Sequence, residues 1–232
     1  MNKGNLVHEV IEQLYLPYKN QILSVPDFQE MKKRLLPLME EHYKSIYHGT
    51  HKKTGRNHII FQVLKKSILD FLEVEQKQVK EGNQIKIIYL EHPFERSLSI
   101  PGIDFPIKLI GAIDRIDLYN ETLRIIDYKT GKIELKHLKL PHWEVFDEQT
   151  EYAYLFQILL YSYVQKSLIS LYPKANAGII SFRNLPQYFM AFSHVNKEDK
   201  LLNPEILNLF EVTLFKIINE IFDSKVNFED KS

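Results

Sequence analysis

Apolar residues recur every three or four positions through the first third of the chain, which is the spacing of an amphipathic helix. Three runs of this kind cover residues 6–15, 27–47 and 59–79. Pro17 ends the first run and Pro37 interrupts the second, because proline disfavours the helix interior. A polar loop, HGTHKKTGRNH, separates the second run from the third. We therefore expect a helical portion over about residues 1–82, with His8 on its first helix.

The middle of the chain changes to short stretches rich in β-branched and aromatic residues, a pattern typical of strands. These stretches cover residues 85–94, 107–119 and 122–128. Asn120 and Glu121 lie between the last two and predict a tight hairpin turn. After them we expect a helix from an N-cap at Thr150 to Leu171, strands over 177–182 and 188–195, and a last helix opened by Asn203 and Pro204.

No repeat, low-complexity tract or linker divides the chain, so we expect residues 1–232 to form a single α/β domain. Its predicted fold is a central mixed β-sheet flanked by helices. The helical N-terminal part covers about residues 1–82, the sheet core about 83–195, and the C-terminal helix about 203–223.

Composition narrows the class of protein. The chain has 232 residues, 44% hydrophobic and 26% charged, which indicates a globular protein. Thirty basic residues balance thirty acidic ones, so net charge argues neither for nor against a polyanionic partner. The absence of cysteine excludes disulfides, thiolate zinc sites, iron–sulfur clusters and a cysteine nucleophile. No long apolar run or signal peptide is present, so we expect a cytoplasmic protein without a membrane partner.

The segment GAIDRIDLYNETLRIIDYKTG carries the most specific candidate chemistry. A hairpin here brings Asp114 near Asp127 and Lys129, and the latter two share one face because they lie two residues apart on a strand. Two carboxylates and an ammonium group on one surface can hold a divalent metal and position a water. The alternative is an ordinary Asp–Lys ion pair at a strand end.

Gln157, Tyr161, His8 and Glu91 are further candidates, each with a simpler explanation. Gln157 and Tyr161 lie four residues apart on an expected helix and so share a face; packing alone also explains that spacing. His8 is either a site residue or a half-exposed helix histidine. Glu91, on the strand before Asp114, is either part of the site or a surface glutamate.

Four segments in this order resemble the PD-(D/E)XK nucleases, specifically the RecB-like and AddB-like branch. They are GNLVHEVIE, GAIDRID, IIDYKTG and QILLY. The resemblance implies a restriction-endonuclease-like sheet, with Asp114 as the first acidic position and Asp127-Tyr128-Lys129 as the (D/E)XK triplet. It also implies that His8 joins the metal shell and that Gln157 and Tyr161 form the motif of the following helix. Ile113 replaces the proline of the family name.

Two basic stretches are candidates for DNA contacts, although such stretches are often only solvated surface. The residues that we expect to contact the DNA backbone are Arg115, Lys52, Lys53, Arg56, Lys132, Lys136 and Lys139. Three aromatic residues, Tyr128, Trp143 and Phe146, are candidates either for stacking on bases or for the core.

The resemblance implies a metal-dependent nuclease that hydrolyses phosphodiester bonds in DNA, with a role in DNA repair or recombination. His8, Asp114, Asp127 and the backbone carbonyl of Tyr128 would hold Mg²⁺ or Mn²⁺, and no iron–sulfur cluster is expected. Lys129 would orient the attacking water, with Gln157 and Tyr161 positioning Lys129. The alternative is a non-catalytic nucleic-acid-binding scaffold that serves a helicase domain or subunit. The chain is either excised from a longer protein or free-standing.

Overall fold

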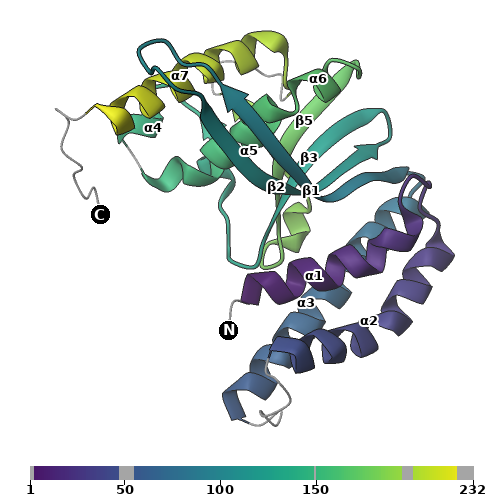
Figure 1. Ribbon diagram of the computed structural model, residues 1–232. Coiled ribbons are helices and arrows are strands. Elements are labelled where there is room, and N and C mark those ends of the chain that lie inside the picture. The colour runs from purple at the N-terminus through teal and green to yellow at the C-terminus, as the bar shows by residue number, and fades with distance from the viewer. Residues whose placement is uncertain (1–2, 47–54, 149, 195–200, 224–232) are drawn as a thin grey trace.

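Three long helices form the N-terminal part of the computed structural model, which describes residues 3–46, 55–148, 150–194 and 201–223. They are α1 (Lys3–Tyr15), α2 (Val25–Ile46) and α3 (Gly55–Lys80), with a short turn η1 (Leu16–Tyr18) after α1. Figure 1 shows them side by side as one helical layer against the sheet. Each helix buries the apolar stripe that the sequence predicts, as at Leu6, Val10 and Leu14 of α1.

Helix α2 runs through Pro37 without a break, so the predicted interruption is wrong. Pro37 itself is exposed, whereas Leu35 and Met39 on either side of it are completely buried. The proline ring and the missing backbone N–H therefore lie on the solvent side of the helix. Packing of the buried apolar stripe keeps the helix continuous.

The central sheet is mixed, as predicted, with strand order β1-β2-β3-β5-β6. Its strands are β1 (Ile85–Leu98), β2 (Ile107–Tyr119), β3 (Thr122–Lys129), β5 (Lys174–Ser181) and β6 (Met190–Ala191). β3 and β5 are parallel and the other neighbours are antiparallel. The predicted hairpin turn is confirmed, with Asn120 in the left-handed conformation (φ 54°).

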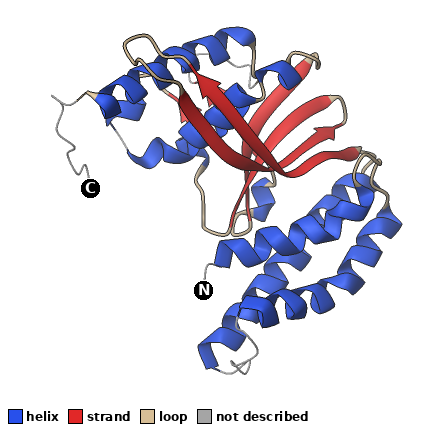
Figure 2. Ribbon diagram, viewed as in Figure 1, coloured by secondary structure: helices blue, strands red, loops and turns tan. Residues whose placement is uncertain are grey.

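Helices cover both faces of the sheet, as Figure 2 shows. Helices α1 to α3 pack against residues such as Ile126 and Ile180, whereas α5 (Ala153–Val164) and α7 (Pro204–Phe222) pack against Ile125 and Ile179. This alternation is the two-residue period of a strand buried on both faces. The arrangement confirms the predicted sheet flanked by helices. Among the described helices, none is sufficiently long and apolar to cross a bilayer.

The remaining elements are short and lie mainly between β3 and α7. They are η2 (Leu135–Leu138), β4 (Lys139–Leu140), α4 (Val145–Glu148), η3 (Thr150–Tyr152), α6 (Lys166–Ile169), η4 (Leu185–Gln187) and β7 (Ser193–His194). β4 and β7 form a separate two-stranded parallel sheet.

Two predicted elements differ from those observed. The helix expected over 150–171 begins instead with η3 and is divided at Gln165 into α5 and α6. Thr150 is therefore not its N-cap, and the Ser162 hydroxyl donates to the Ile158 carbonyl (2.7 Å), a side-chain competition that bends helices. The strand expected over 188–195 is divided between β6 and β7, which lie in different sheets, and its last residue lies outside the described residues.

Candidate active site

Asp114 and Asp127 lie where β2 and β3 begin to separate. The last hydrogen-bonded pair of the hairpin on this side is Arg115 with Ile126, so the ladder stops one residue before the two aspartates. The backbone N–H of Tyr128 donates instead to Asp114 Oδ2, at 2.6 Å. The Asp114 carboxylate thus takes the place of a strand carbonyl, which fixes its orientation inside the protein.

His8 reaches this point from α1. Its Nδ1 lies 3.5 Å from Asp114 Oδ1 and 3.7 Å from Glu91 Oε1. Its Nε2 lies 3.1 Å from the carbonyl oxygen of Tyr128, where only an N–H can make the hydrogen bond. A neutral His8 therefore carries its proton on Nε2 and presents the Nδ1 lone pair to the two carboxylates, which is the orientation of a metal-ligating histidine.

Glu91 completes the acidic group from β1. Its neighbours Leu90 and His92 pair with Arg115 and Ile113, which places Glu91 opposite Asp114. Glu91 has a positive φ of 41°, which a non-glycine residue adopts only at a cost.

The ligand atoms of His8, Glu91 and Asp114 all lie within 4.8 Å of one another. One imidazole nitrogen and two carboxylates are donors that suit Mg²⁺ or Mn²⁺, and the two carboxylates, one buried and one half-buried, repel each other without a cation. The residues present therefore fit a divalent metal.

A chain of polar contacts runs from Asp127 into helix α5. Lys129 Nζ lies 3.0 Å from Asp127 Oδ1 and 2.8 Å from Oδ2, and it donates to Gln157 Oε1 at 3.0 Å. The Gln157 amide in turn donates to the Tyr161 hydroxyl at 2.8 Å. The ammonium group also lies 5.3 Å from the ring centre of Tyr154. The structure thus brings the predicted Lys129, Gln157 and Tyr161 together, and Lys129 is held on three sides.

Burial and mutual repulsion shift the acid–base equilibria of the cluster. Burial, followed by the charge of Asp114, raises the pKa of Glu91 to about 7. The same two causes raise the pKa of Asp127 to about 6, against the opposing effect of Lys129. Burial lowers the pKa of His8, but its interactions with Asp114, Glu91 and Asp127 outweigh this and leave that pKa raised. Acidic groups whose pKa values are raised towards neutral pH in this way are typical of functional sites.

Arg115 does not lie on a nucleic-acid-binding surface, so that prediction is corrected. Its side chain is fully buried between α3 and the hairpin, where it pairs with Glu75 (3.0 Å) and Asp117. Asp117 also accepts two hydrogen bonds from Arg124. Arg115 lies next to Asp114 in sequence, but alternation along β2 points its side chain to the opposite face.

The other predicted DNA contacts are scattered or outside the described residues. Lys132 and Lys136 are exposed and both lie near Glu134 on the segment after β3, and Lys139 is exposed at the start of β4. Lys52 and Lys53 lie outside the described residues. Arg56 is the second residue of α3, and its side chain is not described.

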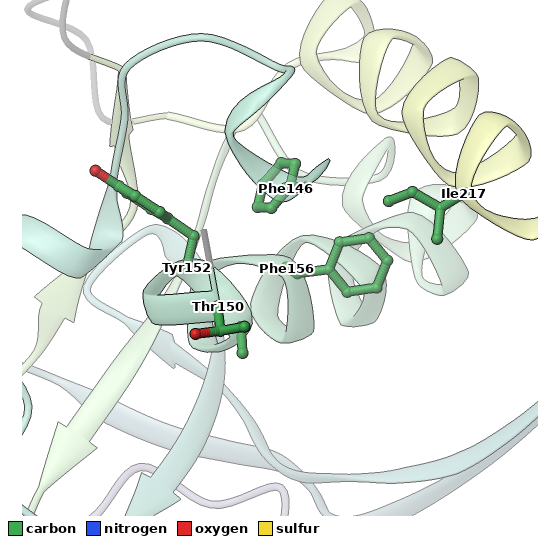
Figure 3. Close-up of a pocket in the computed structure, with 6 residues that line it drawn as sticks. Phe146, Thr150, Tyr152, Phe156 and Ile217 are labelled. Atoms are coloured by element: carbon green, nitrogen blue, oxygen red, sulfur yellow. The ribbon is translucent and has the colours of Figure 1, made fainter. Parts of the chain in front are cut away.

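The candidate aromatic residues lie mainly in the core. Tyr128 is buried and its hydroxyl accepts from Arg115. Trp143 and Phe146 are partly buried, and Phe146 packs edge-on against Phe156 at 5.5 Å. Phe146 also lines a cavity of about 290 Å³ between α4, α5 and α7 (Figure 3). None of the described site residues lines that cavity.

Sequence reasoning missed Tyr154 and the buried network of Glu75, Asp117 and Arg124. Signals for both were present. Tyr154 precedes Gln157 by three residues and therefore lies on the same helix face. The hairpin turn at 120–121 makes Asp117 and Arg124 cross-strand partners, as they are observed to be. No comparable signal identifies Glu75, which lies far along the chain from the hairpin.

Comparison with known proteins identifies a family model that matches almost the whole chain. The family model of the PD-(D/E)XK nuclease superfamily matches residues 1–229. Among solved structures, one titled "Crystal structure of SSO0001" aligns with 98% of this chain and 90% of its own, at 17% identity and a TM-score of 0.26. No curated protein sequence matches the chain.

Proposed function

Because the chain belongs to the PD-(D/E)XK nuclease superfamily, we propose that it is a metal-dependent, RecB-like nuclease that hydrolyses phosphodiester bonds in DNA during repair or recombination. The observation that carries the proposal is the meeting of His8, Glu91 and Asp114 beside the Asp127–Lys129 pair. We also propose that residues 1–232 act as one domain, and that a helicase domain or subunit is its partner, as the RecB-like motifs suggest.

His8 Nδ1, Glu91 and Asp114 would hold Mg²⁺ or Mn²⁺, and Asp127 and the Tyr128 carbonyl are proposed as further oxygen ligands. The cation would polarise the scissile phosphate and lower the pKa of a bound water. The Tyr128 backbone links the two parts of the site, because its N–H holds Asp114 and its carbonyl holds His8.

Lys129 would orient the attacking water or stabilise the charge that develops on the phosphate. Asp127 and Gln157 both accept hydrogen bonds from its ammonium group, and the Tyr161 hydroxyl accepts one from the Gln157 amide. Burial raises the pKa of Tyr161 to about 12, so its hydroxyl stays protonated at neutral pH. For the DNA backbone we retain Lys132, Lys136 and Lys139, together with Lys52, Lys53 and Arg56, as proposed contacts.

The test is incubation of the purified protein with end-labelled linear and closed circular DNA, single- and double-stranded, with Mg²⁺, Mn²⁺ or EDTA. We expect cleavage that depends on the cation. Lys129→Met should lower the cleavage rate by at least 100-fold, because the substitution removes the ammonium group that would contact the reacting phosphate. Lys33→Met, at an exposed lysine of α2 that pairs with Glu30, is the matched control and should retain activity. Full cleavage by a folded Lys129→Met variant would refute the assignment. Cation binding without cleavage in the wild-type protein would favour the non-catalytic scaffold.

A further inference from the structure

A groove of about 180 Å³ opens beside the end of β3, between α1, α3 and the turn that follows β5. Six of its lining residues matter for what it can bind: Ile59, Val63, Ser67, Thr130, Phe182 and Arg183. None of them belongs to the candidate active site. In volume the groove suits a single ring system, because pockets for larger organic ligands begin at about 300 Å³.

The groove shares backbone segments with the candidate active site. Thr130 directly follows Lys129 in the chain, and the Phe182 backbone N–H donates to the Lys129 carbonyl at 2.9 Å. Val7, which also lines the groove, directly precedes His8 on α1. A group bound in the groove would therefore lie close to the backbone that carries His8 and Lys129.

The walls of the groove are apolar and open to solvent. Ile59 is 64% exposed and Val63 is 52% exposed, and they lie four residues apart on one face of α3. Phe182 is almost completely buried beneath them and packs against Phe71 and Tyr128. Ile59 and Val63 therefore form, with the buried Phe182 ring, an apolar slot. In the described part of the chain no side chain covers this slot.

Polar groups stand at the rim of this slot. The Arg183 side chain is exposed, and within residues 3–46, 55–148, 150–194 and 201–223 its guanidinium forms no hydrogen bond or ion pair. Thr130 and Ser67 place hydroxyl groups on the lining. A guanidinium next to an apolar slot is complementary to a flat, weakly polar ring that is joined to a phosphate.

We propose that this groove takes an unpaired nucleobase of a single DNA strand, with Arg183 on the phosphate of that nucleotide, while an adjacent phosphate lies at the Lys129 end. The inference rests on the proposed nuclease function and adds a substrate class to it. A base in a duplex is stacked on both faces and cannot enter the slot, whereas an unstacked base can insert between apolar side chains.

The experiment measures binding without cleavage, in EDTA, by fluorescence anisotropy of three labelled probes. These are a short oligothymidylate, a deoxyribose-phosphate strand of the same length without bases, and a duplex. We expect the wild-type protein to bind the oligothymidylate about 5- to 100-fold more tightly than the base-free strand, the range for one base stacked against side chains. The duplex should bind more weakly than the oligothymidylate.

Val63→Ser and Ile59→Ser should abolish the preference for bases while keeping the affinity for the base-free strand. Arg183→Gln should weaken both single strands by a similar factor. Ile110→Ser, at an apolar residue of β2 that is 70% exposed, is the matched control and should behave as wild type. Equal affinity of the wild-type protein for strands with and without bases would overturn the inference without any variant. Because no step requires catalysis, base-selective binding by a protein that never cleaves would uphold the groove and refute only the nuclease.

Discussion

Glu91 has an unusual backbone conformation for a residue within a strand. It lies within a strand, yet its φ of 41° is left-handed, and its carboxylate faces Asp114 and His8. A positive φ at a non-glycine residue costs of the order of 1 kcal/mol or more and persists where the surrounding structure imposes it. Together with the raised pKa of about 7, this indicates that the position serves the cluster rather than the strand.

Glu91→Gln should weaken Mn²⁺ binding by at least tenfold, because it removes one of the charged ligands while keeping the shape of the side chain. Isothermal titration calorimetry measures the affinity directly. Glu95→Gln is the matched control, since Glu95 lies on the same strand, is exposed and pairs only with Lys108 among the described residues. If both variants bind Mn²⁺ as the wild type does, Glu91 is not a ligand.

The metal-free protein should become more stable as pH falls from about 8 to about 5. Raised pKa values of about 7 for Glu91 and about 6 for Asp127 mean that the folded state binds these protons more readily than the unfolded state. The raised pKa of His8 acts in the same direction. Urea denaturation in EDTA across this range should show a smaller gain for Glu91→Gln than for wild type. An equal gain in both proteins would contradict the assignment for Glu91.

At the scale of residues, the local sequence pattern predicts the part of the site that lies on the β2–β3 hairpin. The hairpin turn fixes the register of β2 and β3, so the proximity of Asp114, Asp127 and Lys129 follows from local pattern. The positions of His8 and Glu91 depend on how α1 docks and on a left-handed residue in β1, neither of which has a local signal. The charge of Arg115 favours the surface, whereas the alternation of its strand places the side chain in the interior.

Helix α3 and the β2–β3 hairpin are joined by a buried charge network. Glu75 contributes one carboxylate from α3, Asp117 and Arg115 come from β2, and Arg124 comes from β3. Two carboxylates balance two guanidinium groups, and hydroxyls of Tyr15 and Tyr188 donate to Glu75. The network fixes the back of the strand whose other face holds Asp114.

Asp117→Asn should lower the free energy of unfolding by about 3 kcal/mol or more, because it leaves two buried guanidinium groups with one carboxylate. Guanidinium denaturation at neutral pH provides the measurement. Asp70→Asn breaks an exposed ion pair with Lys66 on α3 and should change stability by less than about 1 kcal/mol. A loss of similar size in both variants would show that the buried network contributes no more than a surface pair.

Pro37→Ala should stabilise the protein by about 1–2 kcal/mol. The substitution restores a backbone donor in the interior of α2, an effect partly offset by the greater entropy of the unfolded chain. Urea denaturation compares it with Leu36→Ala, at a neighbouring exposed position that should gain nothing. A destabilised Pro37→Ala variant would mean that the proline favours the observed path of the helix.

At the scale of elements, periodicity predicts helices and strands well and their ends poorly. Long runs with one buried face, such as α1 and α7, occur where the pattern places them. The break at Gln165 follows the hydrogen bond of Ser162 to the helix backbone, and β6 and β7 are divided because they pair in different sheets; no glycine or proline marks either point. Pro37 shows the converse, since a residue that breaks isolated helices is tolerated on the exposed side of a packed one.

In the whole molecule, the candidate site lies at the junction of three layers. His8 comes from the helical layer of α1 to α3, the acidic residues come from the sheet, and Gln157 comes from α5 on the other face (Figure 1). Ligands on separate layers can meet only when both layers are docked. A cation bound by His8, Glu91 and Asp114 would therefore stabilise the folded state as a whole.

Saturating Mn²⁺ should accordingly raise the free energy of unfolding by about 2.7 kcal/mol at a concentration 100 times the Kd, provided the unfolded chain does not bind it. Thermal melting with Mn²⁺ and with EDTA measures the shift. Asp114→Asn keeps an oxygen for the Tyr128 N–H but removes the central charge of the cluster, so its melting temperature should not respond to Mn²⁺. An equal response in this variant would place the stabilising cation elsewhere and would separate the acidic cluster from the proposed chemistry. Magnesium should act in the same direction, because its preference for oxygen ligands is met by the same two carboxylates.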